Sequence, residues 1–411
     1  MNCQNRVTDL FVRNWLLCAA YAIFALLFFV SVSTASTIEG QVMGGGAPIT
    51  RSTVGLWAAS AGVPHRLAQA QTGEDGRFTL NFNNPNPANV LYVIAKGGEP
   101  AVHRAGGANP AIALLSVLGS KPPAHATINE FTTIASVWTN AQFLNGAELK
   151  GYALGLKIAA GNVPNFVDLE SGGWGTAIQG PLNSGQTPTM ANFATLADLI
   201  AGCITRVKPD ACGRLFAASK PPGGDTPTDT LIAAQAIARY PWYQPEHLFL
   251  LLRDFYPVPA GRTMRAVPFM PYLNFPPSAW VLPLKFDGGG YRAGGKAMFD
   301  SEGNLWVGDN FTIGWQALDN LWQGNATKFA PNGSPLSPMT IGFAGGGMQG
   351  GTFGAAVDAN DNAWLASYGG KSIAVFDKNG KALTPPDGIT FGGRLGLMQG
   401  IIVTPSGDVW A

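Results

Sequence analysis

The C-terminal part of the chain repeats one short pattern, and this repeat constrains the fold more than any other feature of the sequence. An apolar segment, a turn rich in Gly, Asn or Asp, and a Trp follow one another three times, in residues 295–306, 354–364 and 400–410. A second element, Phe-x-x-Asn-Gly, begins at Phe329 and again at Phe376. The last two Trp copies are 46 residues apart and the first two 58, so the first unit carries an insertion. A period near 46 residues, built of short strands and turns, is typical of a β-propeller blade.

The first 35 residues have the order of a secretory signal. Arg6 and Arg13 come first, an apolar run over residues 15–32 follows, and small residues lead up to Ala35. The run is also close to the roughly 20 residues that span a bilayer. Cleavage after Ala35 and an uncleaved signal anchor therefore both stay open. Either way, residues 36–411 are expected outside the cytoplasm, whether secreted, periplasmic or at the cell surface, with membrane contact only through an uncleaved N-terminal segment.

The charge balance argues against nucleic acid as a partner. Lys and Arg number 26 against 25 Asp and Glu, a formal net charge of +1. Such a chain has no electrostatic footprint for nucleic acid or for anionic lipid. An apolar content of 46% together with 53 Gly and 30 Pro predicts a folded, turn-rich chain with mainly β structure.

Two cysteines lie beyond the N-terminal segment, and their spacing suggests a bond. Cys203 and Cys212 form an even pair in a chain expected to be exported, so a disulfide is predicted. Two unpaired buried thiols are the alternative.

Residues 36–100 are predicted to form a small Greek-key β-sandwich. Strand-length apolar segments at residues 38–42, 52–57, 77–82 and 90–95 alternate with turn clusters of Gly, Pro, Asp and Asn. The combination of Ile38-x-Gly-x-Val, Pro48-Ile-x-x-Ser-Thr-Val-x-Leu and Thr72-Gly-Glu-Asp-Gly-Arg-Phe-Thr-Leu resembles the carboxypeptidase regulatory-like domain. That resemblance implies a seven-stranded sandwich that serves as a non-catalytic spacer or adhesion module. Residues 101–126 are interpreted as a linker.

Residues 127–257 are predicted to form a helical module. Thr127 and Glu130 have the spacing of a capping box before a helix that Gly146 would close. A second helix is expected from Pro227, the favoured first position, through Ala238. Residues 193–204 and 246–255 are helical by spacing.

The sequence predicts no catalytic residue, no cofactor and no metal site. The histidines stand without partner ligands and are expected on the surface or at a helix cap: His65, His103, His125 and His247. The Asp/Asn run at residues 358–362 is predicted to be a hairpin turn, because Gly369 stands where a calcium loop needs Glu. The Gly-rich runs at residues 341–351 and 391–400 lack the Lys-Ser/Thr of a phosphate loop.

The Met-Gln-Gly triplet that recurs in these Gly-rich runs has two interpretations. It is either an inter-blade connection with a structural role or a ligand-binding loop rim, since loops on a rigid scaffold commonly carry binding. The residues concerned are Met348, Gln349, Met398 and Gln399.

The blade motif also suggests relatives. Asp-x-x-Gly-Asn-Leu-Trp-Val from Asp300, followed by Phe-x-x-Asn-Gly, resembles NHL-type and streptogramin-lyase-like propellers. The resemblance implies a propeller portion, assigned to residues 270–411 with strands from Trp280 onward. Lyases of that group depend on a histidine and a magnesium ion at the channel. No histidine follows His247, so no residue of these blades matches that role.

Three blades do not close a ring that normally needs four to eight. We therefore expect the 411 residues to be a fragment of a longer protein, with closure by self-association as the alternative. The fold class predicted is mainly β: a small β-sandwich, a helical middle module and a partial propeller. The function predicted is an exported, non-enzymatic binding or scaffolding protein whose partner is a protein or a glycan. The alternative is a lyase- or hydrolase-like propeller enzyme with its active site in other blades.

Overall fold

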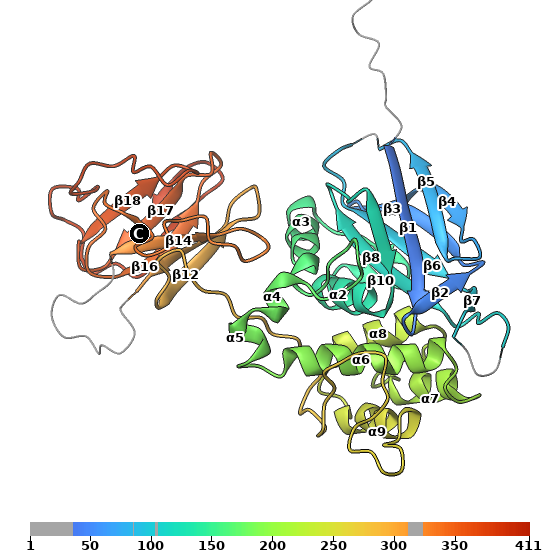
Figure 1. The fold of residues 1–411 in the computed structure, drawn as a ribbon. Helices are drawn as coiled ribbons and strands as arrows, with labels where there is room; N and C mark the ends of the chain where they lie inside the picture. The colour runs from blue at the N-terminus through green and yellow to red at the C-terminus, as the bar shows by residue number, and fades with distance from the viewer. Residues whose placement is uncertain (1–35, 85, 103–105, 311–323) are drawn as a thin grey trace, which may run out of the picture.

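The protein consists of a β-sandwich joined to a group of helices, followed by a stack of short antiparallel sheets (Figure 1). The computed structural model describes residues 36–84, 86–102, 106–310 and 324–411. The fold is mainly β, with 28% strand and 21% helix. This agrees with the fold class expected from the sequence.

Two sheets form the small Greek-key sandwich. β1 pairs with β5, β2 and β9 in one sheet, and β3 pairs with β4 and β6 in the other, which β8 completes. In β5 every second side chain is buried, so the alternation seen in the sequence places Phe78, Leu80 and Phe82 inside. The strands are β1 Ser36–Gly44, β2 Ala47–Thr50, β3 Thr53–Ala58, β4 His65–Gln71, β5 Arg77–Phe82, β6 Leu91–Lys96, β7 Glu99–Pro100, β8 Ala113–Gly119 and β9 His125–Ile128.

Residues 101–126 do not form a linker, contrary to the prediction. β8 pairs with β6 and β9 pairs in parallel with β1, so both belong to the sandwich. β8 is apolar on both faces because α2 covers the face turned away from the sandwich core. A short apolar run with both faces buried lacks the alternation by which a strand is recognised.

The helices share one hydrophobic core with the sandwich. Buried side chains from β1 to α9 form a single cluster, so the predicted boundary at residue 127 does not separate two cores. The predicted helices at residues 193–204 and 246–255 are confirmed as α6 and α9. The elements are α2 Glu130–Asn140, β10 Leu144–Asn145, β11 Glu148–Leu149, α3 Ala153–Gly161, the 3-10 helix η1 Val163–Asn165, α4 Thr176–Gln179, α5 Pro181–Ser184, α6 Thr189–Ile204, α7 Ala211–Ala218, α8 Thr230–Arg239 and α9 Pro245–Phe255.

Two predicted helix starts are displaced. The capping box of α2 joins Asn129 and Thr132, whereas Thr127 belongs to β9. α8 begins at Thr230 with Asp229 as its cap, so Pro227 lies before the helix. α2 also ends at Asn140, and Gly146 lies in the turn between β10 and β11 instead of closing the helix.

Residues 280–286, which we call the strap, were predicted to be a strand but run extended across the helices without a partner strand (Figure 1). Side chains replace the partner strand. Asn192 donates to Val281 O, Thr189 donates to Pro283 O, and Asn183 both donates to and accepts from the backbone of Lys285. The segment does alternate apolar residues, but its backbone hydrogen bonds go to side chains of α5 and α6, to Trp138 of α2 and to the carbonyl of Pro241.

Three sheets follow in sequence, and we call them blades 1, 2 and 3. The inner strand of each blade packs beside that of the next, and Gly308 of blade 1 lies so close to the backbone of Thr352 that a Cβ would collide with it. Blade 1 comprises β12 Gly294–Phe299, β13 Leu305–Asp309, β14 Asn325–Phe329 and β15 Phe343–Ala344; blade 2 comprises β16 Thr352–Val357, β17 Ala363–Ser367 and β18 Ser372–Phe376; blade 3 comprises β19 Ile402–Val403 and β20 Val409–Trp410.

The hairpin turns of the three blades use the same backbone geometry. Gly303, Asp361 and Gly407 occupy equivalent positions with φ of 81°, 62° and 91°. The Asp/Asn run of blade 2 is therefore a turn, as predicted, with Asp358 accepting the backbone N–H groups of Asn360 and Asn362.

The predicted signal segment, residues 1–35, lies outside the described residues. Among the described residues, no helix combines the length and the apolar character needed to cross a membrane.

Candidate functional site

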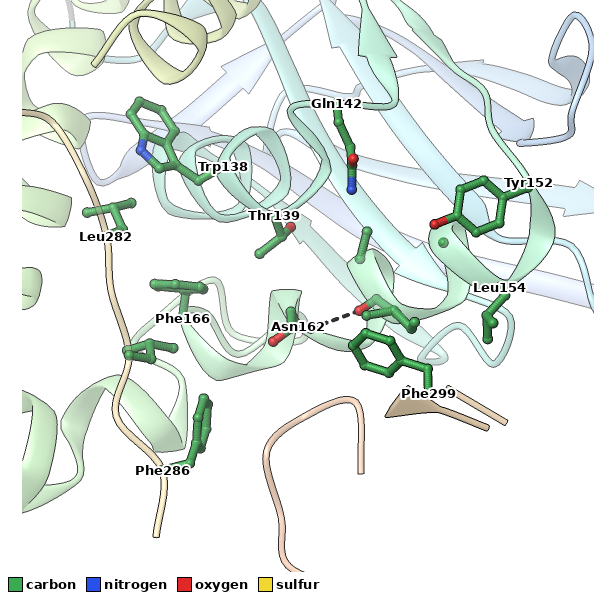
Figure 2. Close-up of a pocket in the computed structure, with 14 residues that line it drawn as sticks. Trp138, Thr139, Gln142, Tyr152, Leu154, Asn162, Phe166, Leu282, Phe286 and Phe299 are labelled. Atoms are coloured by element: carbon green, nitrogen blue, oxygen red, sulfur yellow. Dashed lines mark hydrogen bonds between the residues drawn. The ribbon is translucent and has the colours of Figure 1, made fainter. Parts of the chain in front are cut away.

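A cleft lies between the helices and blade 1 (Figure 2). It consists of two adjoining hollows of about 530 Å³ each, which share Ile158, Asn162, Phe286 and Phe299. We call it the interlobe cleft. One hollow is lined by Trp138, Thr139, Gln142, Tyr152, Leu154, Gly155, Ile158, Ala159, Asn162, Phe166, Leu282, Leu284, Phe286 and Phe299. The other is lined by Ile158, Asn162, Phe286, Tyr291, Gly294, Gly295, Ala297, Phe299, Leu305, Val307, Phe329, Ala330, Pro331 and Gly333.

Three segments position the aromatic walls. Tyr152 caps α3, and its ring packs edge-on against Phe143 at a centroid distance of 5.8 Å. Phe286 ends the strap, directly after the Lys285 backbone that Asn183 holds. Phe299 ends β12 and its ring points toward α3 (Figure 2). The walls therefore come from a helix, from the strap and from a blade strand.

The polar groups of the cleft are few. Asn162 Nδ2 donates to Ile158 O at 2.9 Å (Figure 2). Asn162 Oδ1 accepts from Asn165 Nδ2 at 3.1 Å. Trp138 Nε1 donates to Trp280 O at 3.0 Å, which fixes the strap against α2. Each carboxamide oxygen has a second lone pair, so Asn162 can still accept one hydrogen bond.

None of the described residues that line the cleft carries a charge. The nearest ion pair joins Lys157 of α3 to Glu302 of blade 1 at 2.6 Å, next to the lining residues Ile158 and Phe299. Apolar walls with a small number of polar groups are the usual composition of a small-molecule site. The cleft therefore suits a neutral ligand.

The residues singled out in the sequence lie elsewhere. Cys203 at the end of α6 and Cys212 in α7 form a disulfide with an S–S distance of 2.08 Å. Met348 and Met398 are buried, 6% and 8% exposed, in the cores between blades. Their burial removes both methionines from any ligand-facing rim and fits the structural interpretation. Gln349 and Gln399 are exposed on different inter-blade loops.

The described histidines do not converge. His65 lies on β4, His247 on α9, and His125 on β9 beside Glu39 at 3.7 Å, while His103 lies outside the described residues. Within the described ranges, no group of three His, Cys, Asp or Glu side chains could hold a metal ion. The histidines thus bring no shared chemistry to the cleft.

Three buried carboxyls have strongly raised pKa values, and none of them lines the cleft. Burial raises the pKa of Glu130 to about 7 and that of Asp198 to about 8. Burial also raises the pKa of Asp309 to about 6, against hydrogen bonds from Thr327 Oγ1 and Asn325 Nδ2. Raised pKa values occur in structural networks as well as in active sites. Here the partners of the carboxyls, among the described residues, are backbone N–H groups and, for Asp309, also the side chains of Thr327 and Asn325.

Sequence analysis did not identify the residues of the cleft. It assigned no helix to residues 153–161, because Gly155 and Gly161 interrupt a short segment with little amphipathic pattern. It placed Phe286 in a strand and Phe299 in a repeat unit. One difference between the repeats points to the cleft. The first repeat has Phe299 at the position where the second has the smaller Val357.

Comparisons with known proteins assign no family. No protein-family model matches the chain, and no curated protein matches it. Among solved structures, a 9R-lipoxygenase from Cyanothece shows 11% sequence identity and a TM-score of 0.18, over 76% of this chain and 42% of that one. The chain thus spans less than half the length of that protein, and a TM-score this low carries no argument about fold or function.

Proposed function

We propose that the protein is an exported, non-enzymatic binding or scaffolding protein that binds a neutral ligand in the interlobe cleft. The sandwich, as a carboxypeptidase regulatory-like module, and the helices serve as a rigid base. The blades, as part of an NHL-type propeller, supply the opposite wall of the cleft. Export rests on the signal-like N-terminus and agrees with the Cys203–Cys212 disulfide.

The observation that carries the proposal is the exposure of large aromatic side chains in an uncharged cleft. Tyr152 is 64% exposed, Phe299 43% and Phe286 36%. Exposed apolar groups gathered in one concave place mark binding sites more often than scattered ones do. A charged ligand would lose its hydration there without gaining an ion pair, so neutral ligands such as uncharged glycans or apolar side chains are favoured.

The test compares ligand binding in the full chain and in two variants. Isothermal titration with neutral oligosaccharides and with small apolar compounds is expected to find a ligand that Phe286→Ala/Phe299→Ala binds at least tenfold more weakly. Phe275→Ala is the matched control, because Phe275 is 78% exposed and does not line the cleft. Equal binding by the wild type and the double variant would place the ligand elsewhere and contradict the proposal. Cell fractionation tests export separately.

A further inference from the structure

In the interface between blades 1 and 2, residues of blade 1 cover the face of blade 2 that is turned toward it. Trp306 of blade 1 is fully buried and packs in one cluster with Ala363, Leu365 and Phe376 of blade 2. Its ring lies 5.4 Å from that of Phe343 in β15 of blade 1. The Trp306 indole of blade 1 therefore fills the space between blades 1 and 2.

The same positions in blade 1 line the interlobe cleft. Leu305, Val307 and Phe329 are the counterparts of Ala363, Leu365 and Phe376 in the aligned strands. Phe286 is the counterpart of Phe343: a Cβ on Gly333 would collide with the ring of Phe286, just as a Cβ on Gly380 would collide with that of Phe343. The cleft is thus bounded by a second copy of the face against which Trp306 packs.

The described residues that line the hollow against this face of blade 1 include no Trp. α3 faces it with Ile158 and Asn162, and open space remains between them and the blade. Phe299 stands at the position that Val357 has in blade 2, and its larger ring adds apolar surface to the cleft. Val307 and Phe329 are nearly buried, at 6% and 9% exposed, but Phe299 stays open at 43%.

We propose that the interlobe cleft binds a neutral aromatic ring, seated against blade 1 as the Trp306 indole is seated against blade 2. This rests on the proposed binding function of the cleft and names its ligand class. Flat rings pack on Phe286 and Phe299 in offset or edge-on contact. Asn162 Oδ1, which can accept one more hydrogen bond, matches a ring N–H. Charged rings are disfavoured because the described lining carries no charge.

The experiment uses 5-fluoroindole as the probe, followed by fluorine NMR on the full chain. A saturable broadening of the fluorine signal is expected with the wild type. Ile158→Trp, which places an indole in the cleft from α3, is expected to abolish it. Val63→Trp is the matched control, because it adds an indole at an exposed sandwich loop, where Val63 is 70% exposed. Phe299→Ala, a mild truncation of a half-exposed side chain, is expected to weaken binding at least tenfold.

Four results would overturn the inference. If Ile158→Trp retains full binding of the probe, the ring is not in the cleft. If a neutral oligosaccharide saturates the cleft and Ile158→Trp blocks it while 5-fluoroindole does not bind, the ligand class is wrong and the binding function stands. If neither binds, both fail. A concentration-dependent dimer that Trp410→Ala abolishes would make the occupant a second copy of the chain, since Trp410 is 66% exposed.

Discussion

Glu130 of α2 and Asp198 of α6 lie fully buried where the helices meet the sandwich. Glu130 Oε1 accepts the N–H of Gly45, in the turn between β1 and β2, at 2.7 Å. Asp198 Oδ1 accepts the N–H of Phe269, in the segment that follows α9, at 2.9 Å. Each carboxyl thus fastens a chain segment to a helix. The sequence suggested a capping role for Glu130, but its side chain reaches another layer of the fold.

These two carboxyls predict that the protein loses stability as the pH rises from about 4 to 8. Burial raises the pKa of Glu130 from 4.5 to about 7 and that of Asp198 from 3.8 to about 8. An acid with a raised folded pKa contributes stability that is fully present below its unfolded pKa and lost as pH rises through the folded one. The free energy of unfolding is therefore expected to fall between pH 4 and pH 8.

Urea unfolding across this pH range measures the effect. The slope is at most about 1.4 kcal/mol per pH unit for each group. Glu130→Gln/Asp198→Asn is expected to reduce the slope, to which Asp309 also contributes, whereas Glu148→Gln, at an exposed position, leaves it unchanged. A double variant with the same pH slope as the wild type would show that other groups control it.

Blades 1 and 2 make different side-chain contacts around their equivalent Asp and Trp residues. In blade 1, Lys328 Nζ pairs with the buried Asp300 at 2.9 Å and lies 4.8 Å from the Trp306 ring. Burial acts to raise the pKa of Asp300, but hydrogen bonds from Asn304 and Lys328 hold it below its ordinary value. In blade 2, Val375 replaces the lysine, and Trp364 Nε1 donates directly to Asp358. The repeat preserves the backbone but not the side-chain contacts.

At the scale of elements, the strap depends on side-chain hydrogen bonds in place of a partner strand. Asn183 satisfies the Lys285 carbonyl at 3.0 Å and the Lys285 N–H at 2.7 Å. Asn183→Ala is expected to cost about 1–3 kcal/mol of stability, because it leaves both backbone groups unpaired. Hydrogen exchange should then show faster exchange over residues 281–286, with the sandwich unchanged.

Asn86→Ala, at an exposed turn of the sandwich, is the matched control for the strap and is expected to leave its exchange unaltered. Unchanged protection of residues 281–286 in Asn183→Ala would mean that packing alone holds the strap.

The sequence predicted those turns and helices whose conformation depends on residues close to them in the chain. The hairpin turns of the blades, with positive φ at Gly303 and Gly407, followed from residue type, and α6 and α9 followed from spacing. α3 and the strap did not, because their conformations depend on contacts with residues distant in the chain. Since α3 and the strap supply much of the lining of the interlobe cleft, its position could not be predicted.

At the scale of the molecule, the interlobe cleft lies between parts of the chain with separate hydrophobic cores. The sandwich and helices share one core, and the blades have others. α3 contacts blade 1 where Ile158 and Leu154 lie near Gly303 of the hairpin and Gly161 lies near Pro331, and the strap contacts it where Phe286 lies against Gly333. The separation of the walls, and with it the shape of the cleft, therefore depends on these contacts.

The ion pair between Lys157 and Glu302 spans this contact, so it should influence the cleft without belonging to it. Both side chains are substantially exposed, at 41% and 67%, and such pairs contribute about 0.2–1 kcal/mol. Lys157→Glu places two like charges together and is expected to weaken 5-fluoroindole binding about two- to fivefold. It should also speed hydrogen exchange in the turn at residues 300–304.

Lys157→Glu/Glu302→Lys restores the attraction and should recover both the binding and the exchange rate. The defect should shrink in 1 M salt, where charges are screened within about 3 Å. Lys150→Glu, which breaks the exposed pair with Glu148 away from the cleft, should change neither measurement. If the double variant binds no better than Lys157→Glu, the pair does not hold the two walls together.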